Sequence, residues 1–130
     1  MAYGNLLTDV VQSSTTGTPP VFKDGNGTQI GTLCRAWVNF NGSTLTIIAS
    51  YNISSVTKAS GGVYTCNFST SLSDTNYAVV SNAITTGYYA QIAASYNDYK
   101  TTSNFMVNTT TQGGGTSWSD ASTVNTAVFR

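Results

Sequence analysis

Short segments in which apolar and polar residues alternate recur along most of this chain, and Gly, Asn, Asp and Ser residues separate them. A period of two residues places successive side chains on opposite faces of a β-strand. In residues 33–40 one parity is apolar and holds Cys34, Ala36, Val38 and Phe40. The other parity holds Arg35 and Asn39 together with Trp37, so this tryptophan is expected to point away from that group. No window of eleven or more residues has a helical period.

The alternating segments are spaced by roughly ten residues, which is typical of sandwiches and small barrels. Strands are predicted over residues 33–40, 43–50, 51–57, 63–69, 77–85, 88–95, 105–107 and 121–129. Asp24-Gly25-Asn26-Gly27 lies between two short β-prone pieces and predicts a hairpin. The fold class is therefore all-β, an antiparallel β-sandwich or small barrel of about seven or eight short strands with an extended N-terminal arm.

Composition supports this fold class and excludes several functions. Of 130 residues only five are Lys or Arg and five are Asp, with no Glu and no His, so the formal net charge is zero. Phosphate binding needs a basic face, so a nucleic-acid partner is not expected. No stretch of about 20 apolar residues predicts membrane insertion. The short apolar start lacks the basic residues of a secretory signal, which favours assembly in a cytoplasm.

The titratable residues indicate a protein that is not an enzyme and has no cofactor. Without His, a Ser-His-Asp or Cys-His arrangement cannot form within one chain. A pair of catalytic carboxylates would have to come from scattered Asp residues, most of them in turn-like sequence. Two Cys and no His do not make an ordinary zinc site. The run from Asp24 partly resembles a calcium loop, but Gln29 and Arg35 stand where Gly and Glu are needed, so a turn is favoured and no metal site is predicted.

Cys34 and Cys66 both lie in predicted strands and could meet across a sheet. A disulfide between them would close a loop of about 33 residues and contribute roughly 3–4 kcal/mol. Two buried thiols are the favoured alternative, because a cytoplasmic product starts reduced.

Residues 1–20 differ from the rest, so two parts are expected: an extended arm over 1–20 and a β-sandwich domain over 21–130. The arm's polar run ends in Pro19-Pro20, which enforces extended backbone. Its apolar residues are few and are predicted to bind a neighbouring subunit or partner. The predicted partner-binding residues of the arm are Leu6, Leu7, Val10, Val11, Pro19 and Pro20.

Aromatic residues are the candidates for recognition or for a subunit interface, and core or subunit-interface positions are the favoured reading of the tyrosines. Tyrosine and tryptophan give broad contact area at low entropic cost. Tyr88 and Tyr89 are adjacent in a predicted strand, so one of the two is expected in the core. The candidate set is Trp37, Tyr88, Tyr89, Tyr96, Tyr99 and Trp118.

Residues 31–42 (GTLCRAWVNFNG), with 51–57, 62–70 and 76–80, resemble a domain of short virion proteins and tail-fibre tips of tailed bacteriophages, many of them phages of cyanobacteria and other marine bacteria. The likeness covers about residues 1–80, including the N-terminal lead-in, and AWVNFNG is its most specific piece. It implies a structural role in the virion, assembly in the host bacterial cytoplasm, and trimers. It carries over no catalytic residue.

Two placements on the particle follow from this resemblance. In the first, the chain is a trimeric capsid decoration (cement) protein whose arm lies on the major capsid protein. In the second, it is a tail-fibre or fibre-tip adhesin that binds a host surface glycan. A chain of this length leaves no room for a fibre shaft, which favours decoration. A depolymerase-like enzyme is disfavoured by the missing His and Glu.

Overall fold

The computed structural model describes residues 8–14, 20–85, 90–93, 99–111 and 118–130. The chain divides into two compact units, Met1–Leu33 and Cys34–Arg130, which are described separately here. All regular elements in the described ranges are β-strands, and every strand pair is antiparallel. The same ranges hold no helix long and apolar enough to cross a membrane. The predicted all-β class is confirmed.

The first unit contains the predicted hairpin, in which β1 (Phe22–Lys23) pairs with β2 (Gln29–Gly31). Asp24 Oδ1 accepts hydrogen bonds from the backbone N–H groups of Asn26 and Thr28, both at 2.9 Å. The carboxylate therefore closes the turn, as expected of Asp in this position. Because these two strands pair only with each other, the hairpin belongs to the N-terminal unit, and the division falls after Leu33 instead of after residue 20.

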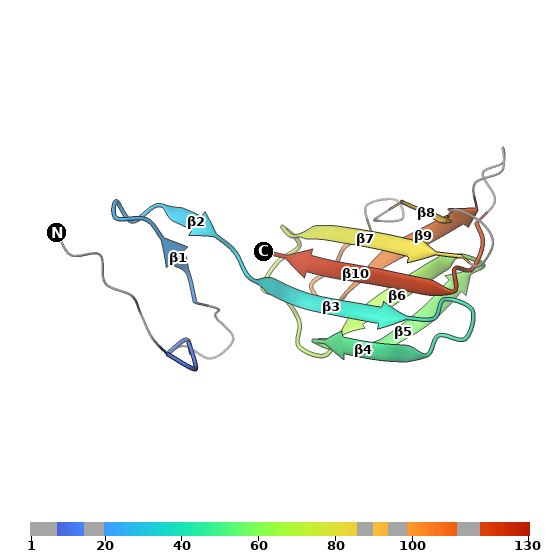
Figure 1. Cartoon of the computed structure of the whole chain (residues 1–130), viewed down its shortest axis with the longest axis horizontal. Coiled ribbons are helices and arrows are strands. Elements are labelled where there is room, and N and C mark those ends of the chain that lie inside the picture. Colours follow the sequence, from blue (N-terminus) through green and yellow to red (C-terminus); the bar gives the residue numbers. More distant parts are fainter. Residues whose placement is uncertain (1–7, 15–19, 86–89, 94–98, 112–117) are drawn as a thin grey trace. The chain divides into compact units, whose positions relative to one another are not determined.

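The second unit is a sandwich-like pair of four-stranded sheets, with no closed barrel among its described strands (Figure 1). One sheet has the order β4 (Ile47–Tyr51), β3 (Cys34–Phe40), β10 (Thr123–Phe129), β7 (Ala78–Ile84). The other has the order β5 (Ile53–Ser60), β6 (Val63–Phe68), β9 (Asn104–Thr111), β8 (Ala90–Ala93). The last strand of the chain thus lies in the middle of the first sheet.

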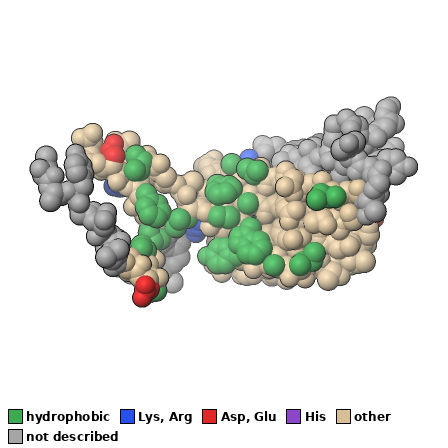
Figure 2. Space-filling model, in the orientation of Figure 1, with side chains coloured by type: hydrophobic (Ala, Val, Ile, Leu, Met, Phe, Trp, Pro, Cys, Tyr) green, Lys and Arg blue, Asp and Glu red, His purple; other side chains and the backbone are tan. Residues whose placement is uncertain are grey.

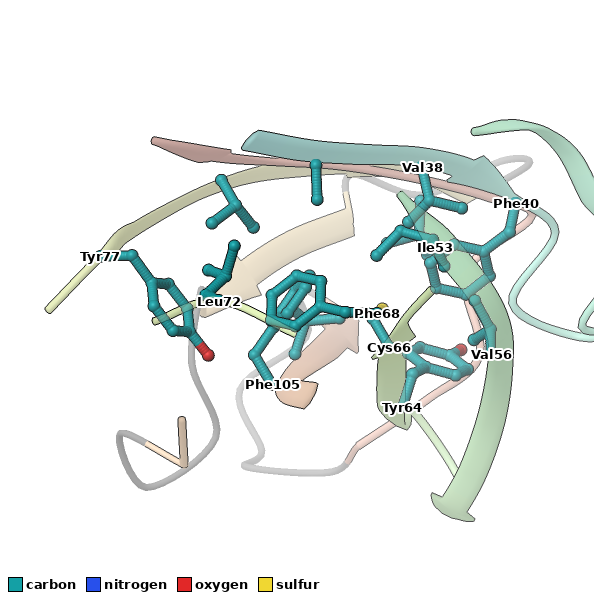
Figure 3. Packing of buried hydrophobic residues seen from close by; sticks show 14 of the residues in the cluster. Val38, Phe40, Ile53, Val56, Tyr64, Cys66, Phe68, Leu72, Tyr77 and Phe105 are labelled. Atoms are coloured by element: carbon teal, nitrogen blue, oxygen red, sulfur yellow. The ribbon is translucent and has the colours of Figure 1, made fainter. Parts of the chain in front are cut away.

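The hydrophobic core lies between these two sheets and takes the inward parity of each strand. Val38 and Phe40 of β3 meet Tyr64 of β6, and the rings of Phe40 and Tyr64 are 5.2 Å apart, edge to face. A second aromatic group joins Phe68 to Tyr77 at 5.9 Å and to Phe105 at 5.5 Å (Figure 3). Edge-to-face rings of this kind add about 0.5–1.5 kcal/mol beyond their buried area.

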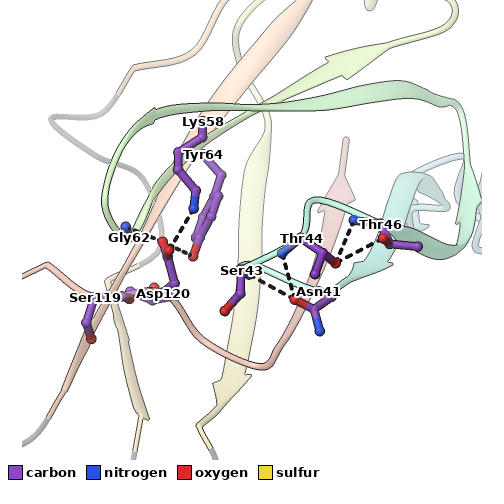
Figure 4. Close-up of polar contacts among 10 residues, drawn as sticks. Asn41, Ser43, Thr44, Thr46, Lys58, Gly62, Tyr64, Ser119 and Asp120 are labelled. Atoms are coloured by element: carbon purple, nitrogen blue, oxygen red, sulfur yellow. Dashed lines mark hydrogen bonds and ion pairs between the residues drawn. The ribbon is translucent and has the colours of Figure 1, made fainter.

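The turn after β3 is longer than the tight Asn41-Gly42 turn that the sequence suggests. Strand β4 begins at Ile47, not at Ser43, because Asn41 N–H donates to the Thr46 carbonyl and Leu45 adopts a φ of 62°. The Asn41 side chain caps this loop by accepting from the N–H groups of Ser43 and Thr44 (Figure 4). Hydrogen bonds within the loop therefore satisfy its backbone groups, and the pairing of β4 with β3 begins only after the loop.

Both cysteines are free thiols, in agreement with the favoured alternative. Cys34 is partly buried at the start of β3, where its Sγ donates to the Ala36 carbonyl at 3.2 Å. Cys66 is fully buried in the core, and burial raises the pKa of its thiol to about 12. Cys66 therefore acts as a small apolar residue.

Candidate functional site

Asp24, Asp74 and Asp120 make structural contacts. Residues of the His, Cys, Asp and Glu types form no cluster of three or more there that could hold a metal ion. Asp74 forms an ion pair with Arg130 and accepts from the Asn76 N–H at 2.8 Å. The Arg130 hydrogen bond is the main cause that lowers the pKa of Asp74. Asp98 lies outside the described residues.

Asp120 has the richest surroundings of these carboxylates (Figure 4). Its Oδ1 accepts from Gly62 N–H at 2.8 Å and from the Tyr64 hydroxyl at 3.1 Å, and its Oδ2 pairs with Lys58 Nζ at 2.6 Å. Burial alone raises the pKa of Asp120, but the hydrogen bonds from Lys58, Gly62 and Tyr64 outweigh it and the net pKa is lowered. These donors belong to the β5–β6 hairpin, so Asp120 fastens the segment before β10 to the opposite sheet.

The arm residues predicted to bind a partner are partly described. Val10 and Val11 are 69% and 58% exposed, and Pro20 is half-buried. Leu6, Leu7 and Pro19 lie outside the described residues. The same unit also exposes Phe22 and Ile30 of the hairpin, which the sequence did not single out.

Among the predicted recognition residues, the structure describes three and exposes all three. Trp37 is 40% exposed, Tyr99 45% and Trp118 44%. Tyr88, Tyr89 and Tyr96 lie outside the described residues. Trp37 lies on β3, whereas Tyr99 and Trp118 lie beside β9 of the other sheet, through Met106 and Thr110. The described aromatic candidates therefore do not share one strand ladder.

The outer face of the β4-β3-β10-β7 sheet gathers apolar side chains around Trp37, and Figure 2 shows them grouped over these strands. Trp37 pairs with Tyr51 on one side and with Ala127 on the other, and Ala127 pairs with Val80. Directly paired residues of antiparallel strands point to the same side. Tyr51, Trp37, Ala127 and Val80 consequently form one row across all four strands, called the apolar row below.

A second row lies beside the apolar row and consists of side-chain amides. Asn39 pairs with Asn125, and Asn125 pairs with Asn82. Asn125 Nδ2 donates to Asn82 Oδ1 at 2.9 Å. This second set, the amide row, gives the face hydrogen-bonding groups without charge.

The two rows border an open trough of about 410 Å³ above strand β10. Ala127 is small, so the larger side chains of Trp37 and Val80 stand on either side of it. Asn39, Asn125 and Asn82 line the same trough. The shape suits an inserted apolar or aromatic group with polar contacts along one edge.

Sequence reasoning predicted the outward direction of Trp37 but missed Tyr51, Val80 and Ala127. Their parity within their own strands was readable, and Val80 and Tyr51 are 60% and 57% exposed. These residues lie in one row only because β10 pairs in register with both β3 and β7. The pairing of Ala127 with Trp37 joins residues about 90 positions apart in the sequence. Local periodicity carries no such information.

No protein-family model, no characterised protein and no solved structure matches this chain. Function therefore has to be inferred from the residues of the chain itself.

Proposed function

We propose that this chain is a non-enzymatic structural protein of a bacteriophage virion, a trimeric capsid decoration protein on the particle surface. The observation that carries the proposal is the N-terminal unit. Its hairpin pairs only with itself, and it exposes Val10, Val11, Phe22 and Ile30. Exposed apolar side chains on a short segment are typical of an arm that is buried on a partner.

The chemistry of the sandwich supports the same role. Hydrogen-bond donors occupy the carboxylate oxygens of Asp74 and Asp120 in this unit. Polarity comes from hydroxyl and amide groups in a chain with only 8% charged residues. Surfaces of this kind repel each other weakly, which favours packing of many copies on one particle. The resemblance of residues 1–80 to short virion proteins supports assembly of the chain into a phage particle.

The second candidate is a tail-fibre or fibre-tip adhesin that binds a host glycan. The observation that favours it is the exposure of Tyr99 and Trp118, because aromatic rings stack on sugars. In this case the chain would sit at a tail end, in contact with other fibre proteins.

Gold labelling of purified phage particles, with antibodies raised against residues 34–130, tests the proposal. Label spread over the capsid shell, with a copy number that scales with the number of capsomers, is expected of a decoration protein. Label confined to the tail tip, with few copies, would establish the adhesin placement instead. Particles without label would contradict any virion role.

A further inference from the structure

We propose that the outer face of the β4-β3-β10-β7 sheet is the surface on which a second copy of this chain binds. The half of the face that carries Tyr51 and Trp37 packs against the trough of the second copy. That trough lies between Trp37 and Val80 of the same second copy. This inference goes beyond the trimer of the proposed function, because a face that packs on its own copy makes a two-fold contact between two chains, and it does not depend on where the chain sits on a particle.

The first argument is the uneven profile of the apolar row. Its β4–β3 half carries the two large rings, Tyr51 and Trp37, and its β10–β7 half carries the small Ala127 and then Val80. Large side chains in one half and a trough in the other make the face complementary to itself. When two such faces meet with their halves exchanged, Trp37 lies over Ala127 of the other copy, and Tyr51 lies over Val80.

The second argument is charge. The outward side chains of the strand pairs around the trough include Asn39, Asn82 and Asn125 and the four members of the apolar row, and none of them is charged. Arg35, which shares the parity of Trp37 near the start of β3, is the single charged residue of the outward parity in these four strands. Two identical charged faces would repel each other, whereas identical neutral faces do not. A face with exposed aromatic residues, neutral amides and little charge resembles the core of a protein interface.

The third argument is size. Strands about 4.8 Å apart with a rise of about 3.3 Å per residue give three strands of seven residues and one of five a projected face of roughly 410 Å². That projected area is about half of the roughly 800 Å² that each partner buries in a standard interface. The size is therefore that of a weak contact, and association between copies is expected at high protein concentration.

Other occupants fit the face less well. A glycan could stack on Trp37 and Tyr51, but Ala127 and Val80 offer it no hydrogen bond from a side chain. Of the amides that line the trough, Asn125 and Asn82 already bond to each other. An unrelated protein would not explain why the large half and the hollow half match each other. A second copy accounts for both halves at once.

Sedimentation of the full chain at about 100 µM tests the proposal. A mass of twice 13.7 kDa is expected for the unmodified chain, and Val80→Lys or Ala127→Glu should weaken association at least about tenfold, because each buries a charge in the contact. Thr57→Lys is the matched control. It adds the same charge at an exposed position of β5, on the other sheet, and should leave the mass unchanged.

Disulfide trapping identifies the contact itself and does not depend on a substitution that weakens it. In a Cys34→Ser background, Tyr51→Cys combined with Val80→Cys should give covalently linked oligomers on oxidation, and neither single substitution should. Within one copy these positions are separated by three strand spacings, about 14 Å, which is too far for a disulfide. Unchanged circular dichroism of each variant would show that the sandwich remains folded.

Three results would overturn the proposal. One is a monomeric full chain at this concentration, and another is equal association of Val80→Lys and Thr57→Lys. The third is a monomer that binds phage particles only when Val80 is intact, which would identify a different virion protein as the occupant. None of these results would alter the gold-labelling test, so a failure here is distinguishable from a failure of the virion role.

Discussion

Asp120 illustrates how one residue can hold two sheets of a sandwich together. It is one of five acids in the chain, and its two oxygens receive a backbone N–H, a phenol and an ammonium group from the β5–β6 hairpin. A buried hydrogen bond to a charged group typically has a net value of about 1.5–3 kcal/mol, and partial exposure of the Asp120–Lys58 pair reduces it. The lowered pKa of Asp120 reports that the folded chain favours its charged form.

Replacement of this carboxylate should reduce stability in a way that depends on pH. At pH 7, Asp120→Asn is expected to lower the free energy of unfolding by about 1–2 kcal/mol, because the ion pair with Lys58 is lost and one acceptor oxygen remains. Since the folded pKa lies below the unfolded value of about 3.9, the stabilisation is complete above that pH and is lost as pH falls through the folded pKa. Urea denaturation at pH 7 and pH 2.5 should therefore show a difference that shrinks in acid.

The control for this measurement is Asp24→Asn in the N-terminal hairpin. An Asn oxygen can accept the same two backbone hydrogen bonds, so the turn is retained and the free energy of unfolding should change by less than about 0.5 kcal/mol. A difference between Asp120→Asn and the unmodified chain that stays constant with pH would contradict the assigned role of the charge.

At the scale of elements, the β5–β6 hairpin depends on a glycine that the sequence marks only as a turn residue. Gly62 has a φ of +68° and is buried against the segment that leads into β10. A Cβ atom there would lie 2.5 Å from Ser119 N and 2.6 Å from the Thr109 carbonyl oxygen. The same two atoms form a hydrogen bond of 3.1 Å that a side chain at Gly62 would break.

Alanine at the two adjacent glycines should therefore have unequal effects. Gly62→Ala is expected to lower the free energy of unfolding by about 2–3 kcal/mol, from the left-handed backbone and the lost hydrogen bond. Gly61→Ala should change it by less than about 1 kcal/mol, because the nearest atom to its Cβ would be 3.9 Å away. Equal midpoints for the two variants in urea would show that the hairpin can shift to accommodate the methyl group.

At the scale of the whole molecule, the two units differ in the interactions that stabilise their folds. Every member of the hydrophobic core belongs to Cys34–Arg130, from Ala36 to Val128. The first unit contributes a single hairpin and several exposed apolar side chains. A two-stranded hairpin is marginal alone, so the N-terminal unit is expected to be ordered chiefly when it binds a partner.

Removal of residues 1–33 should consequently separate folding from assembly. The remaining chain is expected to unfold cooperatively, with a Tm within about 5 °C of that of the full chain, because no core residue is lost. Binding to phage particles that lack this protein should be abolished if the N-terminal unit is the docking arm. Calorimetry and co-sedimentation measure the two properties, and retained co-sedimentation would contradict the role of the arm.

The sequence by itself determined the strands, their faces and the turns that close locally. Alternation placed Val38 and Phe40 inward and Trp37 outward, and the structure confirms all three. The Asp24 hairpin was equally readable, because its carboxylate bonds to residues two and four positions away. The predicted strand boundaries were wrong where a loop forms hydrogen bonds within itself, as it does after Asn41.

Only the tertiary structure decided the order of the strands and, with it, the candidate interface. Ala127 and Val80 carry no local sign of importance, and they become the trough because β10 lies between β3 and β7. Strand order depends on pairing between distant segments, and several segments of this chain share the same period and composition. Parity is a local property that a sequence displays, whereas the choice of neighbour is decided by how all strands bury the core together.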